Sequence, residues 1–145
     1  MIPARLIEAL AEEIRDATKD YVLKAEGQAD KKLSVYCQHI PDEKFMSDTY
    51  YPLVIVSVQN VEDDEQGIST ATIGLTIGVY GEDEQAWMDL LSIMVRIRQR
   101  VCMQRIIDRK YALVLPNKWE TVEAQPYPYL YGYATLKYRI GHVSL

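Results

Sequence analysis

The stretch Tyr129-Leu-Tyr-Gly-Tyr-Ala-Thr-Leu-Lys-Tyr-Arg-Ile140 alternates strictly between two kinds of side chain. Successive side chains of a β-strand point to opposite faces, so a period of two residues indicates a half-buried strand. The mainly apolar set comprises Leu130, Gly132, Ala134, Leu136, Tyr138 and Ile140. The second set comprises Tyr129, Tyr131, Tyr133, Thr135, Lys137 and Arg139. We therefore predict one long strand whose apolar face lies in the core.

The second face of this strand is unusual for a solvent-exposed surface. It presents three stacked tyrosines followed by two cations, and tyrosine and arginine are enriched at protein interfaces. Pro126 and Pro128 flank Tyr127, which favours an extended approach to the strand. We predict that this face contacts another subunit or a partner through these residues: Tyr129, Tyr131, Tyr133, Lys137 and Arg139.

Two segments have the spacing of amphipathic helices. Residues 3 to about 24 place apolar side chains three and four apart, with charged residues opposite them. Residues 82 to about 105 predict a second helix, with acids at its start and arginines towards its end, as the helix dipole favours. We expect the apolar stripe of this second helix to face the protein core. The stripe comprises Trp87, Leu90, Leu91, Met94, Ile97 and Val101.

Several shorter segments predict strands. Residues 52–59 and 70–80 are rich in β-branched residues and alternate, and the polar, Gly-containing segment between them predicts a hairpin. Residues 33–40 predict a short strand, and residues 111–115 a further one. After a turn at Pro116-Asn117, residues 119–122 continue the sheet.

This order of elements predicts an α+β fold. One sheet of about four main strands, with both helices on one face, is the simplest way to bury both apolar stripes. At 145 residues, without repeats or a linker, the chain is expected to form a single domain over residues 1–145. We also expect Gly132 and Ala134, like Gly74 and Gly78, to allow the close approach of a neighbouring element.

The composition excludes several classes of protein. The chain is 48% hydrophobic and 26% charged, which is typical of a globular domain. A net charge of −5 argues against nucleic-acid binding, because such proteins need a basic surface to displace counterions. No apolar run approaches the ~20 residues of a membrane helix, and the N-terminus does not resemble a secretory signal. We therefore expect no membrane partner, and nucleic acid is disfavoured.

The sequence shows no catalytic or cofactor motif. It lacks GxGxxG, GxxxxGK[ST] and GxSxG patterns, so we expect no enzyme and no cofactor. Cys37 and Cys102 are interpreted as reduced, structural thiols. A zinc site would need Cys37, His39, Cys102 and His142 together, without the usual paired spacing, and no metal site is predicted. A small enzyme with a site around Cys37, His39 and Glu43 is the last-ranked of the hypotheses for function.

Charged clusters of opposite sign offer further contact candidates. Asp63, Asp64 and Glu65 lie in an acidic run that we place on a solvated turn, because the run lacks the ligand spacing of a calcium loop. Arg96 and Arg100 lie towards the end of the second helix, where the dipole match explains them without an anion site. Opposed charges across an interface would orient docking, so these acids and arginines are added to the predicted contact residues.

The chain resembles a family of small tail proteins of siphophages and prophages, and more specifically the tail terminator (tail completion) group. The resemblance covers roughly residues 50 to 142. The stretches that carry it are Tyr51-Pro-Leu-Val-Ile-Val56, Ala71-Thr-Ile-Gly-Leu-Thr-Ile-Gly-Val-Tyr-Gly-Glu-Asp83, the helix from Trp87 to Arg100, Leu115-Pro-Asn-Lys-Trp-Glu120 and Gln125-Pro-Tyr-Pro-Tyr-Leu-Tyr-Gly132.

This resemblance implies an α+β domain with a mostly antiparallel sheet flanked by helices. It also implies that the domain forms a hexameric ring, caps the tail tube and offers a surface to the head connector. It implies no active site. The implied partners are other copies of the chain, the tail-tube protein and head-connector proteins. The implied location is the cytoplasm of the bacterial host during assembly, and then the virion tail. Two alternatives stay open: another head–tail connector or minor tail protein, and a small binding module that uses the tyrosine-rich sheet face.

Overall fold

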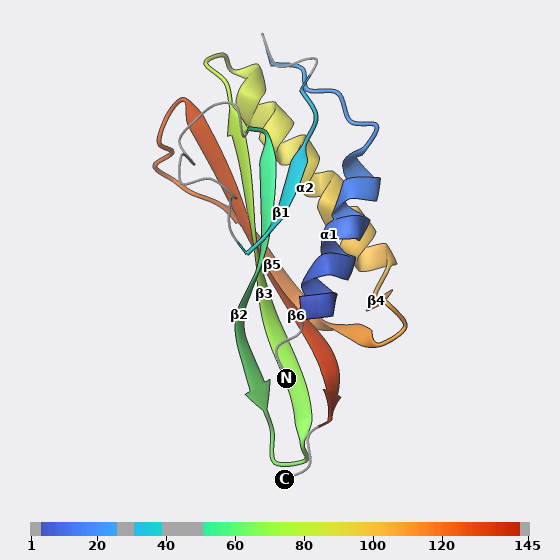
Figure 1. Cartoon of the computed structure of the whole chain (residues 1–145). Coiled ribbons are helices and arrows are strands. Elements are labelled where there is room, and N and C mark those ends of the chain that lie inside the picture. The colour runs from blue at the N-terminus through green and yellow to red at the C-terminus, as the bar shows by residue number, and fades with distance from the viewer. Residues whose placement is uncertain (1–3, 26–30, 39–50, 143–145) are drawn as a thin grey trace.

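The computed structural model describes residues 4–25, 31–38 and 51–142, with only the backbone for residue 142. Within these residues the chain forms two helices and six strands (Figure 1). Their order is α1 (Ala4–Thr18), β1 (Ser34–Cys37), β2 (Leu53–Asp63), β3 (Ile68–Tyr80), α2 (Gln85–Met103), β4 (Ile106–Ile107), β5 (Tyr111–Thr121) and β6 (Tyr129–His142).

The strands form one twisted sheet in the order β1-β2-β3-β6-β5-β4. Strand β1 runs parallel to β2, whereas β2–β3, β3–β6, β6–β5 and β5–β4 are antiparallel pairs. The predicted α+β class is confirmed. The predicted sheet was wrong in two respects, because the sheet has six strands rather than about four, and it is mixed rather than mostly antiparallel.

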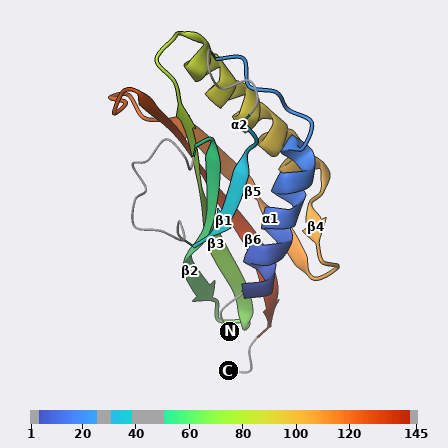
Figure 2. The same cartoon turned by 45° about the horizontal axis from the view of Figure 1, so that its top comes forward.

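Both helices lie on the same face of the sheet, as Figures 1 and 2 show from two directions. Helix α1 contacts α2, β1 and β2, and α2 contacts β3 and β6. The inward residues of β3 and β6 alternate as predicted and are almost fully buried. They comprise Ala71, Ile73, Leu75, Ile77, Val79, Ala134, Leu136, Tyr138 and Ile140. The alternating pattern of β6 therefore places this strand at the centre of the core.

Gly132 permits the close packing of α2 on β6. A Cβ atom at this position would lie 2.4 Å from Sδ of Met94 and 2.9 Å from its Cε. Only a residue without a side chain leaves room for Met94 at that distance. The expected close approach at Gly132 is confirmed, and the approaching element is α2.

Helix α1 is shorter than its periodic pattern predicts, because residues 19–25 leave the helix. The Thr18 hydroxyl donates to the carbonyl of Ile14 at 2.8 Å, which marks the last turn. The backbone N–H groups of Lys24 and Ala25 donate to the carboxylate of Asp89 on α2 instead of continuing the helix. A contact that is distant in sequence therefore holds residues 24 and 25 outside a helix.

Strand β5 joins two segments that the sequence separated. Its register against β6 shifts between Val114 and Lys118, where three residues of β5 oppose one residue of β6. Pro116 lies inside this bulge, where a missing N–H interrupts no regular ladder. The predicted turn at Pro116-Asn117 is therefore wrong as a chain reversal. The short strand β4, which pairs with the start of β5, was not predicted.

Helix α2 exposes two residues that were predicted to face the core. Trp87 is 50% exposed and Leu91 is 41% exposed, whereas Leu90, Ile93, Ile97 and Val101 are buried. The inward stripe of α2 is centred on these buried residues, so Trp87 and Leu91 point away from the sheet. No helix within the described residues has both the length and the apolar character needed to cross a membrane.

Candidate functional site

The residues of the second face of β6 lie together on the side of the sheet opposite the helices. We call this side the tyrosine face and define it by Tyr129, Tyr131, Tyr133, Lys137 and Arg139. Gly132 and Leu136, which have the other parity, face α2 and the core. The structure therefore brings together these five predicted residues, on one strand and one face.

Tyr51, which comes just before β2, completes a cluster of aromatic rings on this face. Its ring centroid lies 5.0 Å from that of Tyr129 and 6.0 Å from that of Tyr131. Tyr80, the register partner of Tyr129, adds an edge contact at 5.2 Å. We call Tyr51, Tyr80, Tyr129 and Tyr131 the tyrosine cluster. Tilted and edge-on contacts of this kind stabilise aromatic pairs beyond the area that they bury.

The hydroxyl groups of Tyr51 and Tyr131 form a hydrogen bond with each other. Tyr51 is almost fully buried, and burial raises the pKa of its hydroxyl well above the usual value, with the bond to Tyr131 adding to the shift. Gly78, opposite Tyr131 on β3, makes room for both rings, because a Cβ there would lie 2.7 Å from the Tyr51 ring. The tyrosine cluster is thus a packed unit around the neutral hydroxyl of Tyr51.

Tyr133 differs from the two tyrosines before it. Its side chain is 37% exposed, whereas Tyr129 and Tyr131 are half-buried against the cluster. Partial burial raises the pKa of Tyr133, so its hydroxyl is neutral at physiological pH. Tyr133 is therefore the predicted aromatic contact residue with the most surface available to a partner.

Lys137 and Arg139 extend the tyrosine face beyond Tyr133. Both are exposed, and their neighbours in register on β3 are Thr72 and Thr70. Their neighbours on β5 are Val114 and Ala112. Within the described residues, neither cation forms an ion pair. Both charges are thus unpaired within the part of the chain that the structure describes.

The acidic run closes the β2–β3 hairpin, which extends past the N-terminal end of α1 (Figure 1). Asp64 accepts hydrogen bonds from the backbone N–H groups of Gln66 and Ile68, both at 2.9 Å. Asp63 accepts a hydrogen bond from the Ser69 hydroxyl. These two acids therefore shape the turn, and Glu65 is left exposed at its tip.

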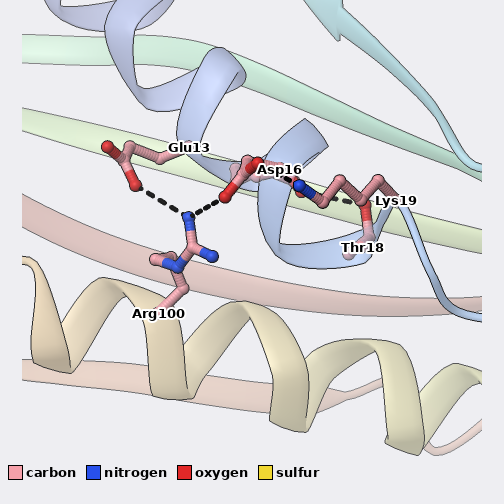
Figure 3. A network of polar contacts seen from close by, with 6 residues as sticks. Glu13, Asp16, Thr18, Lys19 and Arg100 are labelled. Atoms are coloured by element: carbon pink, nitrogen blue, oxygen red, sulfur yellow. Dashed lines mark hydrogen bonds and ion pairs between the residues drawn. The ribbon is translucent and has the colours of Figure 1, made fainter.

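Arg100 belongs to an ion cluster between the two helices (Figure 3). Its guanidinium lies 3.1 Å from Glu13 and 2.8 Å from Asp16, and Lys19 lies 3.0 Å from the same Asp16 carboxylate. Hydrogen bonds from Lys19 and then Arg100 lower the pKa of Asp16, and Asp16 in turn raises the pKa of Arg100. Arg100 is thus engaged within the chain, on the helix side of the sheet.

Arg96 also lies on the helix side. Its guanidinium carbon sits 4.9 Å from the centroid of the Tyr21 ring, which is a cation–π contact between α2 and the segment after α1. The structure therefore separates the predicted contact residues into two groups. The predicted contact residues of β6 lie on the tyrosine face, whereas Arg96 and Arg100 connect α2 to α1 and to the segment after α1.

Sequence reasoning missed two residues that organise these layers. Tyr51 joins the tyrosine cluster only through tertiary packing, and no local pattern signals it. Asp89 is fully buried and accepts hydrogen bonds from the Tyr21 hydroxyl at 2.9 Å and from the backbone N–H of Ala25 at 2.8 Å. A signal was present in this case, because an acid stood at a core-facing position of α2, next to Leu90.

The described residues give little support to the alternatives that are based on cysteine and histidine chemistry. Cys37 and Cys102 are free, half-buried thiols. His39, Glu43 and the side chain of His142 lie outside the described residues. Among the residues that are described, no group of three histidines, cysteines or acids is placed to hold a metal ion.

No protein-family model matches the chain, and no curated protein matches it. Among solved structures, the chain is similar to a chain of the "Virion of native gene transfer agent (GTA) particle". The TM-score is 0.49 at 12% sequence identity, over 93% of this chain and 93% of that chain. Architecture alone does not define function.

Proposed function

We propose that the chain is a structural protein of phage or prophage tail assembly, specifically a tail terminator that forms a homo-oligomeric ring on the end of the tail tube. The observation that carries the proposal is the tyrosine face. It offers Tyr133 together with Lys137 and Arg139, which are exposed and unpaired within the described residues. The resemblance over residues 50–142 gives this surface its proposed context.

A ring requires two different patches on each subunit, because each copy contacts the next head to tail. The cations of the tyrosine face are one patch. Glu65, at the exposed tip of the β2–β3 hairpin, marks an acidic patch of opposite sign. We place the tip of one subunit near Lys137 and Arg139 of the next, with Tyr133 supplying desolvated contact area. We leave Arg96 and Arg100 out of this proposed contact, since they lie on the helix side and contact Tyr21, Glu13 and Asp16 within the chain.

The number of subunits and the further partners follow from the resemblance. They are a hexamer, the tail-tube protein and head-connector proteins, with assembly in the host cytoplasm before incorporation into the virion tail. The role is structural rather than enzymatic. A neighbouring head–tail connector or minor tail protein would use the same kind of surface, and binding to tail-tube protein distinguishes the terminator from these alternatives.

The test is the oligomeric state of the chain, measured by light scattering, with and without tail-tube protein. We expect a ring in solution or on the tube. Tyr133→Ser and the double change Lys137→Glu with Arg139→Glu should reduce its formation while circular dichroism stays unchanged. Lys110→Glu is a matched control, because Lys110 is also exposed but lies on the turn between β4 and β5. The proposal would be ruled out if the chain stays monomeric at high concentration and does not bind tail-tube protein.

The tyrosine face suits single-stranded nucleic acid less well. Stacking needs free ring faces, whereas the rings of Tyr51, Tyr129 and Tyr131 pack against one another. Tight, salt-sensitive binding of single-stranded DNA that is lost in Tyr133→Ser would favour the binding-module alternative instead.

A further inference from the structure

Helix α2 carries apolar side chains on its outward side as well as on its inward side. Trp87, Met88, Leu91 and Val95 are between 41% and 50% exposed, and we call them the α2 ridge. The first eleven residues of α2, 85–95, contain one ionisable residue, Asp89, which is buried. No charged side chain therefore interrupts the α2 ridge. A helix that is apolar on both sides is typically covered on both sides.

Grooves flank the α2 ridge on each side. A groove of about 760 Å³ separates it from the end of α1 and the segment that follows, and its apolar lining includes Ala17, Tyr21 and Met103. A second groove of about 350 Å³ separates it from β5 near Trp119. A ridge between two grooves is the surface that helices use when they pack on one another.

The residues along the outward side of α2 are symmetric about Leu91. Trp87 and Val95 lie four residues before and after it, and Glu84 and Arg98 lie seven before and after. Steps of three, four and seven residues keep all five positions on one side of a helix. Glu84 and Arg98 are exposed, and neither forms an ion pair with another described residue.

This spacing is self-complementary in an antiparallel pair. With a two-fold axis through Leu91, Trp87 of one copy faces Val95 of the other, and each Glu84 faces the other copy's Arg98. The helix dipoles also run in opposite directions. From this palindrome we infer that the α2 ridge is a two-fold contact between two copies of this chain, with their α2 helices packed antiparallel.

This contact is independent of the proposed function. A ring is built from two different patches, whereas a two-fold contact uses the same patch on both copies. The tyrosine face and the α2 ridge lie on opposite sides of the sheet, so one copy has room for both contacts. The α2 contact would join two chains, or two rings back to back.

The test is sedimentation velocity of the whole chain between about 1 and 500 μM, a range chosen because an interface of one helix pair is small and weak. We expect a dimer that forms with rising concentration. Leu91→Lys places two like charges on the axis and should weaken the dimer at least tenfold. Trp119→Phe leaves Trp87 as the sole tryptophan, whose emission should shift to the blue as the dimer forms.

Charge exchange separates this pairing from other contacts. Glu84→Arg and Arg98→Glu should each weaken the dimer, and the combination of both changes should restore it, because each pair regains opposite charges. Arg105→Glu is the control, because Arg105 lies beyond α2 and outside the palindrome. If Arg98→Glu weakens association but the double variant does not recover, the occupant is another surface, such as an acidic hairpin, and the inference is overturned.

Two further results would also overturn it. One is a chain that stays monomeric up to 500 μM with unchanged Trp87 emission. The other is an oligomer that is identical in wild type and Leu91→Lys. The outcomes remain distinct from those of the ring, because Tyr133→Ser should leave the two-fold contact intact, and Leu91→Lys should leave head-to-tail contacts through the tyrosine face intact.

Discussion

Each face of the sheet buries tyrosine side chains, but the two faces differ in the hydrogen bonding of the tyrosine hydroxyl groups. On the helix face, Tyr138 is completely buried, and its hydroxyl has no hydrogen-bond partner among the described residues. On the tyrosine face, the hydroxyl of Tyr51 bonds that of Tyr131 within a cluster of rings. Around Tyr138 on the helix face, apolar packing therefore tolerates an unpaired polar atom. The tyrosine face is organised by specific polar and aromatic contacts that stop short of Tyr133.

The largest expected difference between the faces comes from side-chain truncation on β6. Leu136→Ala should lower the free energy of unfolding by about 3 kcal/mol, because Leu136 is fully buried beneath the helices and leaves a cavity. Tyr133→Ser, three residues away on the other face, should cost less than about 1 kcal/mol, because Tyr133 is partly exposed. Urea unfolding of both variants measures the contrast. Equal losses of unfolding free energy in the two variants would show that the tyrosine face contributes as much to the stability of the fold as the helix face does.

The next effect tests whether apolar packing alone holds the helix layer. Asp89→Ala removes the acceptor for the Tyr21 hydroxyl and for the backbone N–H groups of Lys24 and Ala25. Leaving these donors unpaired should cost about 2 to 3 kcal/mol, measured by urea unfolding. Asp20→Ala, which changes an exposed acid nearby, is the control and should have little effect. A loss confined to Asp89 would show that one buried carboxylate fixes the path of residues 21–25.

Leu136 and Asp89 also show what the sequence could and could not predict. The alternation in β6 placed Leu136 in the core and Tyr133 opposite it, because strand parity is a local property. The role of Asp89 depends on residues about 65 positions away in sequence, as the hydrogen bonds to Lys24 and Ala25 show. Such a contact has no local pattern, although an acid at a core-facing helical position was a signal of it.

The errors in the helices have the same physical origin. Periodicity identified the apolar residues of α2 but could not say which half of a broad apolar surface faces the sheet. Trp87 and Leu91 were therefore assigned to the core, whereas the structure leaves them outward. On the tyrosine face, the residues from Tyr129 to Arg139 were found by parity alone. Tyr51 was not, because residues from different strands meet only after the sheet has formed.

Alkaline pH should destabilise both faces by a related mechanism. Burial raises the pKa of Tyr51 and of Tyr138 above the value of about 10 for an unfolded chain. Folding therefore favours the neutral form, so this contribution is fully present below pH 10 and is lost as the pH rises above it. At pH 11 the loss should be about 1 kcal/mol for each tyrosine. Thermal unfolding of Tyr51→Phe and Tyr138→Phe between pH 8 and 11 measures it. A slope as steep as that of the wild type in both variants would contradict the mechanism.

The smallest effect isolates the hydroxyl groups at neutral pH and bears most directly on the difference between the faces. Tyr131→Phe leaves the buried Tyr51 hydroxyl without the bond to residue 131, which should cost about 1 kcal/mol. Tyr138→Phe removes a hydroxyl that has no partner among the described residues, so it should be neutral or slightly stabilising. Urea unfolding of the two variants under identical conditions tests the pair, since both remove a single oxygen from a tyrosine of the same strand. A comparable loss in Tyr138→Phe would mean that its hydroxyl is bonded in solution, for example to buried water, and the contrast between the faces would then rest on the aromatic packing around Tyr51 alone.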